Sequence, residues 1–531
     1  MAPEPHESRF AVNVYRLQRR PNATQSLIEG SGLTQTLNIP VGLDVESTLY
    51  YGQVSGAPDW LKRLFALAPE APPPPVGASV SGLLPIAVGG RELVLTFGHA
   101  WQKVKASIVE PNFGIRCVLN LAEEKSLRAI RRDRIAEDSL QAIEQIPDSD
   151  DISRFGMDLE KDLLRGVKAK IDPGLGFGAW VAGGDSFKAS IDFLAEPVAK
   201  FILRCLELYE GDSYKKRFEW VDNISPLRDA ALTELLVAEL ASQVAKKDVG
   251  ITLSVPELLS WDDHDYFSFE KKKKGQAPCS NYLDISQWVE FAGSGGKEIT
   301  SERIKELKIY AYRQGGVEVE YWPVLQCLHG TVVHDKRTFL AHAGHWFELS
   351  EGFVAEINNR ISKISLATIN LAATNISEAE GVYNTRVAKD SKGTLMLMDK
   401  KLIWHGGGSS KFEVCDLFSE DGHLICVKQW GGGSGSLSHL FYQAKNAITL
   451  INNDPDFREK VRSYIDKENH KFTLTWEYIC ENPGDAQVVL AVMRGCQKEN
   501  LPFFAKLALC DCVASLRTMR FSASYTVINP I

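Results

Sequence analysis

Two residues near the C-terminal end of the chain have the types and spacing that metal-dependent phosphodiester chemistry requires. Asp416 closes the segment Phe412–Asp416, and Lys428 closes Ile425–Lys428 twelve positions later. A separation of this length suits two strands joined as a hairpin. In such a site acidic oxygens hold Mg²⁺ against the scissile phosphate, while a lysine orients the attacking water and offsets negative charge. The pair therefore predicts a nuclease-like centre.

The position two residues before the lysine lacks the acid that this chemistry needs. Cys426 stands there, on the same strand face as Lys428, because side chains alternate along a strand. A neutral thiol is a poor ligand for Mg²⁺, which prefers hard oxygen. Either Glu380 or Glu413 replaces the missing carboxylate, or the centre no longer cuts. The remaining interpretation is an ordinary exposed aspartate at a hairpin and a lysine on an edge strand.

Periodicity predicts the elements that must position these residues. Residues 375–386 have the pattern of a helix entry, and the segments that follow alternate in the manner of strands. The predicted order continues with strands at 394–404, 411–418 and 423–430, a helix at 437–452, a strand at 473–479, a helix at 503–518 and a strand at 521–528.

This order, with its aspartate and lysine, resembles the αβββαβ core of the PD-(D/E)xK nucleases, which have the restriction-endonuclease-like fold. In that family an aspartate ends the second strand, and the next strand carries an acid, a spacer and a lysine. The resemblance implies that Asp416 holds Mg²⁺ together with Glu380, or Glu378, from the preceding helix, and that Lys428 positions water. Gln443 falls where related nucleases place a polar helix residue. Cys426 departs from the pattern.

Short blocks along nearly the whole chain resemble a second family, a sporadically distributed group of uncharacterised bacterial proteins found near phage-defence and mobile-element genes. The blocks lie at 96–100, 113–116, 218–222, 380–384, 413–417, 437–441 and 501–506. This resemblance implies a setting of antiviral defence, with another defence protein as a partner. It supplies no established catalytic residues.

Composition limits the class of protein. The formal net charge of −8 excludes a wholly basic nucleic-acid coat and leaves room for a local basic face. No run of about 18 apolar residues is present, so we expect no membrane insertion. Residues 1–20 are polar and have no apolar segment typical of a signal peptide. The ten cysteines are scattered without a framework, which favours a reducing cytoplasm.

The chain is too long for one ordinary core, and its patterns predict a multidomain α/β or mixed α+β protein. Helical patterns at 194–210 and 226–246 precede Gly250, where we place the first boundary. The expected parts are an N-terminal α/β domain at 1–249, a middle mixed module at 250–358 and a C-terminal nuclease-like domain at 359–531.

A run of four lysines, Lys271, Lys272, Lys273 and Lys274, lies in the middle module. A charge run of this kind is either a solvated loop or a loop that contacts nucleic-acid phosphates.

Together these patterns lead us to expect a bacterial antiviral-defence protein that binds nucleic acid, DNA rather than RNA, with Mg²⁺-dependent cleavage by a degenerate nuclease-like core. Two alternatives stay open. One is a non-catalytic nucleic-acid sensor that recruits an effector, and the other is a homo-oligomeric scaffold.

Overall fold

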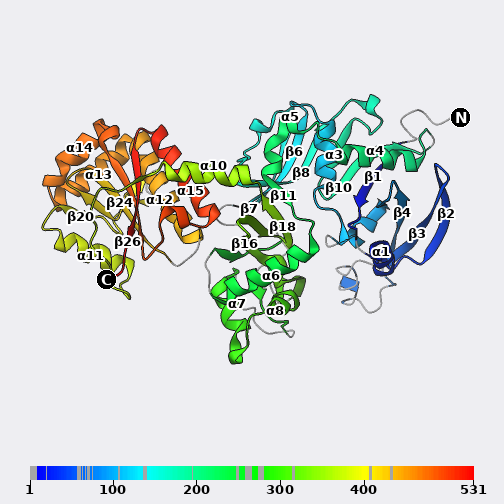
Figure 1. The fold of residues 1–531 in the computed structure, drawn as a ribbon, viewed down its shortest axis with the longest axis horizontal. Helices are drawn as coiled ribbons and strands as arrows, with labels where there is room; N and C mark the ends of the chain where they lie inside the picture. The colour runs from blue at the N-terminus through cyan, green and yellow to red at the C-terminus, as the bar shows by residue number, and fades with distance from the viewer. Residues whose placement is uncertain are drawn as a thin grey trace. The chain divides into compact units, whose positions relative to one another are not determined.

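The computed structural model gives two compact units, which consist of Met1–Asp133 with Gln141–Val221 and of Arg134–Leu140 with Asp222–Ile531. Both contain helices and sheets, so the predicted mixed α/β class is confirmed (Figure 1). The predicted division at 249 and 358 is finer than these two units and stays a prediction. The described residues are 9–531 without 20, 57–60, 62–63, 66, 68–71, 74–75, 106–107, 136–139, 194, 247–249, 257–265, 273–279, 281, 314–316, 406–409 and 431–433.

The first unit is built on a ten-stranded sheet. Its strand order is β2 (Gln35–Gly42), β3 (Val45–Gly56), β4 (Gly77–Val88), β5 (Arg91–Phe97), β1 (Arg9–Arg16), β10 (Ser186–Asp192), β9 (Trp180–Gly183), β8 (Asp162–Lys170), β6 (Leu127–Arg134) and β7 (Leu140–Asp150). Gly89 and Gly90, both with positive φ, turn β4 into the antiparallel β5. A Gly-Gly pair allows this turn because it has no Cβ to clash there.

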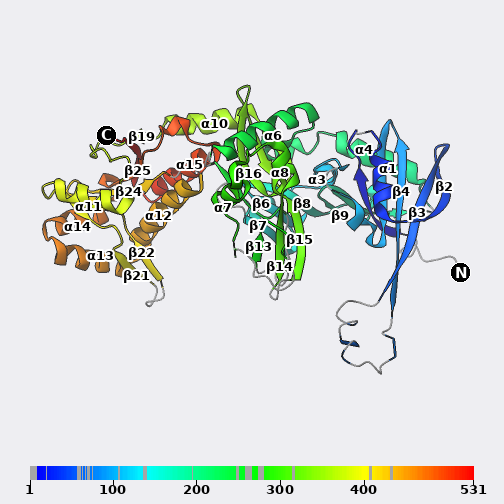
Figure 2. The same ribbon diagram turned by 90° about the horizontal axis from the view of Figure 1, so that it is seen from below.

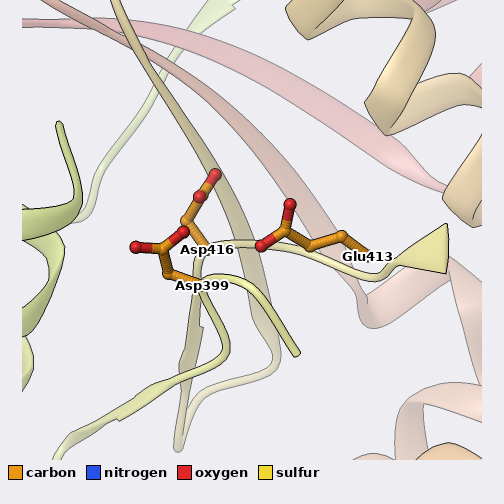
Figure 3. Close-up of side chains that lie close together, drawn as sticks. All are labelled: Asp399, Glu413 and Asp416. Atoms are coloured by element: carbon orange, nitrogen blue, oxygen red, sulfur yellow. The ribbon is translucent and has the colours of Figure 1, made fainter. Parts of the chain in front are cut away.

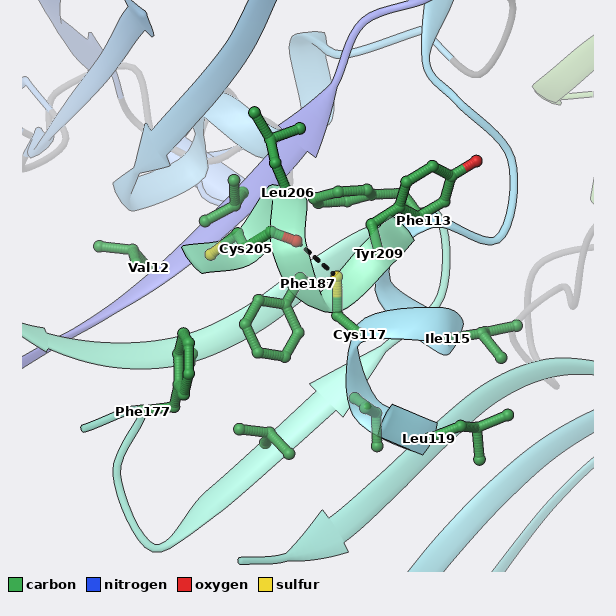
Figure 4. Packing of buried hydrophobic residues seen from close by; sticks show 14 of the residues in the cluster. Val12, Phe113, Ile115, Cys117, Leu119, Phe177, Phe187, Cys205, Leu206 and Tyr209 are labelled. Atoms are coloured by element: carbon green, nitrogen blue, oxygen red, sulfur yellow. Dashed lines mark hydrogen bonds between the residues drawn. The ribbon is translucent and has the colours of Figure 1, made fainter. Parts of the chain in front are cut away.

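Two helices close the core of the first unit against this sheet. They are α3 (Phe113–Leu121) and α4 (Val198–Glu210), and the second confirms the helix predicted at 194–210. Their buried faces interlock with strand side chains such as Phe187, as Figure 4 shows. The Sγ of Cys117 lies 3.5 Å from the backbone carbonyl oxygen of Cys205, so the thiol of α3 donates to the backbone of α4, and both cysteines are free.

The second unit begins with two smaller sheets. One has the order β11 (Ile224–Pro226), β18 (His345–Leu349), β17 (Arg337–His342), β16 (Leu328–His334) and β12 (Ile251–Leu253), and the other β13 (Tyr266–Ser268), β14 (Lys308–Arg313) and β15 (Val317–Pro323). The helices of this part are α6 (Ala230–Ala245), α7 (Ile285–Ala292), α8 (Ser301–Glu306), α9 (Val324–Cys327) and α10 (Glu351–Ser362).

A six-stranded mixed sheet forms the C-terminal part of the second unit. Its order is β19 (Ser365–Leu366), β26 (Ser522–Ile528), β25 (Gln487–Met493), β24 (His423–Gln429), β23 (Leu417–Ser419) and β20 (Leu395–Leu397). Strands β20, β23 and β24 form an antiparallel meander, whereas β24, β25, β26 and β19 run parallel. Five helices accompany the sheet: α11 (Glu380–Asp390), α12 (Ser434–Asn453), α13 (Pro455–Glu468), α14 (Lys471–Glu481) and α15 (Phe503–Thr518).

Helices cover both faces of this sheet. On one face Tyr383 and Val387 of α11 pack against Ile425 and Val427 of β24. Helix α12 packs against β24 and β25, and α15 against α12 and β26. Because neighbouring strand residues point to opposite faces, β24 is apolar on both, as a buried parallel strand requires.

The structure corrects three predicted elements of this part. The strand predicted at 473–479 is wrong, because Phe472, Trp476 and Ile479 are buried at helical spacing within α14. The strands predicted at 394–404 and 411–418 are each interrupted, and their inner halves form a separate hairpin, β21 (Leu402–His405) with β22 (Ser410–Glu413).

None of the described helices has the length and the apolar character needed to cross a lipid bilayer.

Candidate metal centre

The predicted hairpin that carries the aspartate and the lysine is present as β23 and β24. Leu417 pairs with Ile425 in the antiparallel register. Asp416 directly precedes β23 instead of ending a strand, and Lys428 is the sixth residue of β24. Since the strands are antiparallel, the beginning of β23 and the end of β24 meet at the same edge of the sheet.

Asp416 is buried and is held by two neighbouring elements. Its Oδ2 accepts a hydrogen bond of 2.7 Å from the backbone N–H of Val427. Its Oδ1 accepts one of 3.3 Å from Nδ2 of Asn384, which comes from α11. Asn384 is fully buried, and its amide oxygen has no hydrogen-bond partner among the described residues. A cation bound beside Asp416 would give this oxygen the partner that the described residues do not supply.

Two further carboxylates converge on Asp416 (Figure 3). Asp399 lies in the segment between β20 and β21, and Glu413 is the last residue of β22. One carboxylate oxygen from each of Asp399, Glu413 and Asp416 lies within 4.8 Å of the other two. Glu413 accepts hydrogen bonds from the backbone N–H of Lys400 and, at 2.8 Å, from Nε2 of Gln443. The predicted helix residue Gln443 therefore touches the centre through Glu413.

The mutual repulsion of these acids appears in their pKa values. Burial raises the pKa of Asp416 well above its usual range, and the charges of Glu413, Glu380 and Asp399 raise it further, against the hydrogen bond from Val427. Burial and the charges of Asp399 and Glu380 also raise the pKa of Glu413, although hydrogen bonds from Lys400 and Gln443 oppose the change. Oxygen-only donors at this spacing, together with an uncompensated charge, fit a hard divalent cation.

Glu380 and Lys428 form an ion pair beside this group. The Nζ of Lys428 lies 3.3 Å from Oε2 of Glu380, and the backbone N–H of Gln429 donates to the same oxygen at 2.9 Å. Glu380 opens helix α11 and is not one of the three clustered carboxylates, although its charge reaches Asp416 and Glu413. The structure thus brings the predicted residues Glu380, Asp416, Lys428 and Gln443 into one neighbourhood.

Glu378, the alternative helix acid, is engaged elsewhere. It accepts hydrogen bonds from Nε and Nη2 of Arg386 at 2.7 and 2.8 Å. These bonds, followed by the bond from the N–H of Asn375, outweigh burial and lower the pKa of Glu378 to about 2. Its charge is already neutralised by a bidentate partner, so Glu378 is a structural residue of the α11 entry.

Cys426 is buried, and its thiol is not part of the group formed by Asp399, Glu413 and Asp416. Burial raises the pKa of its thiol well above the usual range, and the nearby charge of Asp416 adds to this, so the thiol stays neutral. Glu413 was one of the two acids considered as its replacement, and the structure places it beside Asp416. Asp399 was missed. The sequence signal that could have identified it is the charged pair Asp399 and Lys400 inside the predicted strand 394–404. In the structure this pair forms a turn, in which Lys400 has a φ of 60°.

The lysine run lies apart from this geometry. Lys271 pairs with Glu318 at 3.2 Å and Lys272 with Glu270 at 2.8 Å, so acidic neighbours offset both charges. Lys273 and Lys274 lie outside the described residues. A phosphate-contacting role for the run stays a prediction.

The chain belongs to a family of unknown function (DUF6119), whose model matches residues 12–529. A search of curated proteins found no match, and neither did a search of solved structures. Membership in this family assigns no activity, so the case for a function rests on the residues of the chain itself.

Proposed function

We propose that this protein acts in bacterial antiviral defence by binding nucleic acid, DNA in preference to RNA, and by cleaving its phosphodiester bonds with Mg²⁺. The observation that carries the proposal is the convergence of three carboxylates, Asp399, Glu413 and Asp416, at the sheet edge that also presents Lys428. The buried orphan oxygen of Asn384 supports a cation at the same place.

Each residue has a role that follows from its contacts. Asp416, Glu413 and Asp399 offer the oxygens for Mg²⁺. Glu380, whose charge acts on Asp416 and Glu413, is a further candidate ligand. When bound, the ion would polarise the phosphate and lower the pKa of the attacking water. Lys428, held by Glu380, offsets charge on the phosphate. Gln443 fixes the orientation of Glu413 by its hydrogen bond.

The order of elements around the centre supports assignment to a restriction-endonuclease-like core. Helix α11 is followed by the antiparallel meander β20–β23–β24, then by α12 and by β25, which pairs parallel with β24. This matches the αβββαβ order of that fold, with β21–β22 inserted between the first two strands and α13 and α14 inserted before β25.

A non-catalytic nucleic-acid sensor is the second candidate, and two observations favour it. Cys426 occupies the position of an expected acid, and Lys428 is engaged by Glu380. In this case the same face would clamp a phosphate without cutting, and an effector protein would be recruited.

Cleavage assays on the purified full-length protein separate these functions. The substrates are plasmid DNA, single-stranded DNA and RNA, each with Mg²⁺ or with EDTA. We expect Mg²⁺-dependent cleavage that falls at least about a hundredfold in Asp416→Asn and in Lys428→Met, because metal binding and charge stabilisation are removed.

The matched control is Asp335→Asn, since the Asp335 side chain is 86% exposed and its positive φ suits asparagine. Cleavage that survives in Asp416→Asn would refute the nuclease proposal. Salt-dependent binding without any cleavage would establish the sensor. A stable oligomer that binds neither metal nor nucleic acid would indicate a scaffold.

A further inference from the structure

A short hairpin rises directly from the carboxylate group. Strand β21 begins three residues after Asp399, and β22 ends at Glu413. Leu402 pairs with Glu413 at the base of the hairpin, and Trp404 pairs with Lys411 farther along it. Figure 2 shows the hairpin beside α12 and α13, with which its strands are in contact. The hairpin therefore connects two of the three carboxylates, Asp399 and Glu413.

The two faces of the hairpin have opposite character. Ile403 is buried, and its partner Phe412 lies on the same, inward side. The outward face presents Leu402 and Trp404, which are 52% and 46% exposed, together with the exposed Lys411. Because side chains alternate along a strand, Glu413 shares this outward face with Lys411. Glu413 thus lies on the same face of the hairpin as the exposed Trp404, and this outward face of Leu402, Trp404, Lys411 and Glu413 is called the strip.

Two lysines accompany the exposed indole ring. The Nζ of Lys411 lies 4.2 Å from the centroid of the Trp404 ring, within the range of a cation–π contact. From α13, Nζ of Lys460 donates to the backbone carbonyl of Trp404 at 3.2 Å. Lys411 therefore lies against the indole ring and Lys460 against the backbone of the same residue, while about half of the tryptophan remains accessible.

We propose that the outward face of β21–β22 binds a single strand of nucleic acid next to the carboxylate centre, with Trp404 stacked on a base and Lys411 and Lys460 on backbone phosphates. This inference rests on the proposed function, because it assigns to that centre an unpaired strand as its substrate class.

The chemistry of the strip selects an unpaired strand over other occupants. A base can stack on an exposed aromatic side chain when it is not already stacked within a duplex. This contact tolerates any sequence because every base has a π-face. Lys411 is two residues from Glu413, about 7 Å along an extended strand, so a phosphate at the carboxylates leaves the next one near a lysine. Protein interfaces are depleted of lysine at their centres, which argues against a protein partner here.

Binding of a labelled single-stranded oligonucleotide to the full-length protein in EDTA tests the inference without cleavage. We expect Trp404→Leu to weaken binding about tenfold, because it keeps an apolar side chain but removes the aromatic face. Trp404→Phe is expected to retain most of the affinity, which separates stacking from a loss of folding. Trp101→Leu is the matched control, since Trp101 is also half exposed, at 48%, and lies in the first unit.

The lysines are tested by salt dependence. Lys411→Met and Lys460→Met are each expected to reduce the magnitude of the slope of log affinity against log salt by about 1, the change that accompanies the loss of one phosphate contact. Lys467→Met, from an exposed lysine on the same helix as Lys460, is the control. Binding of a blunt duplex of the same sequence is expected to be the same in the wild type and in Trp404→Leu.

Several outcomes would overturn the inference. They are wild-type affinity of Trp404→Leu for the single strand, an equal loss for the duplex, or a change in oligomeric state alone, which would assign the strip to a second copy of the chain. Failure of this inference and failure of the proposed function give different results in the two assays. Cleavage unaffected by Asp416→Asn would refute the nuclease, whereas Trp404-dependent binding in EDTA would still support the strip.

Discussion

Buried carboxylates are handled in opposite ways in the N-terminal sheet and in the C-terminal centre. In the first unit Asp162 lies 2.6 Å from Nη1 of Arg132, whose Nε also contacts Glu144 at 2.7 Å. Asp133, fully buried, pairs with Arg165 at 3.3 Å. In the second unit the charges of Glu413, Glu380 and Asp399 act on the buried Asp416 and raise its pKa.

The pKa values show the consequence of this difference. Burial alone would raise the pKa of Glu144, but hydrogen bonds from Gly156 and Arg132 and the charge of Arg132 lower it overall. The pKa of Asp416 is instead raised. A buried acid without a positive partner destabilises a fold, so a group of them is retained where a ligand supplies the charge. The acids of the first unit therefore have positive partners that stabilise the fold, whereas Asp399, Glu413 and Asp416 are the acids that the proposed function assigns to Mg²⁺.

The largest effect is expected from breaking the paired arrangement. Arg132→Met removes the guanidinium that lies 2.6 Å from the buried carboxylate of Asp162, and should lower the free energy of unfolding by about 3–5 kcal/mol. Urea denaturation measures this loss. The exposed pair Arg154–Asp150 provides the control, because Arg154→Met should cost no more than about 1 kcal/mol. Equal losses in the two variants would show that burial of the first pair is unimportant.

Metal should reveal the opposite behaviour in the second unit. At a Mg²⁺ concentration a hundred times its Kd, binding should stabilise the wild type by about 2.7 kcal/mol, and Asp416→Asn should abolish this gain. In EDTA the variant should be at least as stable as the wild type, because it removes one of several like charges. Thermal unfolding with and without Mg²⁺ provides the measurement, with Asp335→Asn as control. A variant that loses stability in EDTA would mean that Asp416 is a structural acid.

The pH dependence of stability should be opposite in sign for the two regions. Because the folded-state pKa values of Asp416 and Glu413 are raised, the folded protein holds more protons than the unfolded chain above about pH 4. Metal-free stability should therefore fall as pH rises from 5 to 7.5, by at most about 1.4 kcal/mol per unit for each group.

The paired acid Glu144 has a lowered pKa, so it contributes stability that is lost only as pH falls below about 4. Unfolding free energies in EDTA measured from about pH 3 to pH 7.5 test both signs. Asp416→Asn should flatten the slope between pH 5 and 7.5, and an unchanged slope would exclude Asp416 as its source.

The sequence predicted the parts of the centre that are local. The hairpin β23–β24, with Asp416 and Lys428 at its open edge, follows from alternating residues and turn chemistry, and the helix at 503–518 matches α15 in its bounds. Strand β25 was not predicted, because its residues 488–493 are a continuous buried apolar run that carries no alternation. Helix α14 was mistaken for a strand for a related reason, since a short apolar run fits both periods.

The sequence alone determined which reactive side chains are present: Asp416 and Lys428 at hairpin spacing, and Cys426 where an acid was expected. Only the tertiary structure decided which acids join them. Asp399, Glu413 and Asp416 meet because β21–β22 is inserted between strands of the sheet and returns its two ends to one edge. Convergence of this kind depends on long-range packing, which local pattern does not encode.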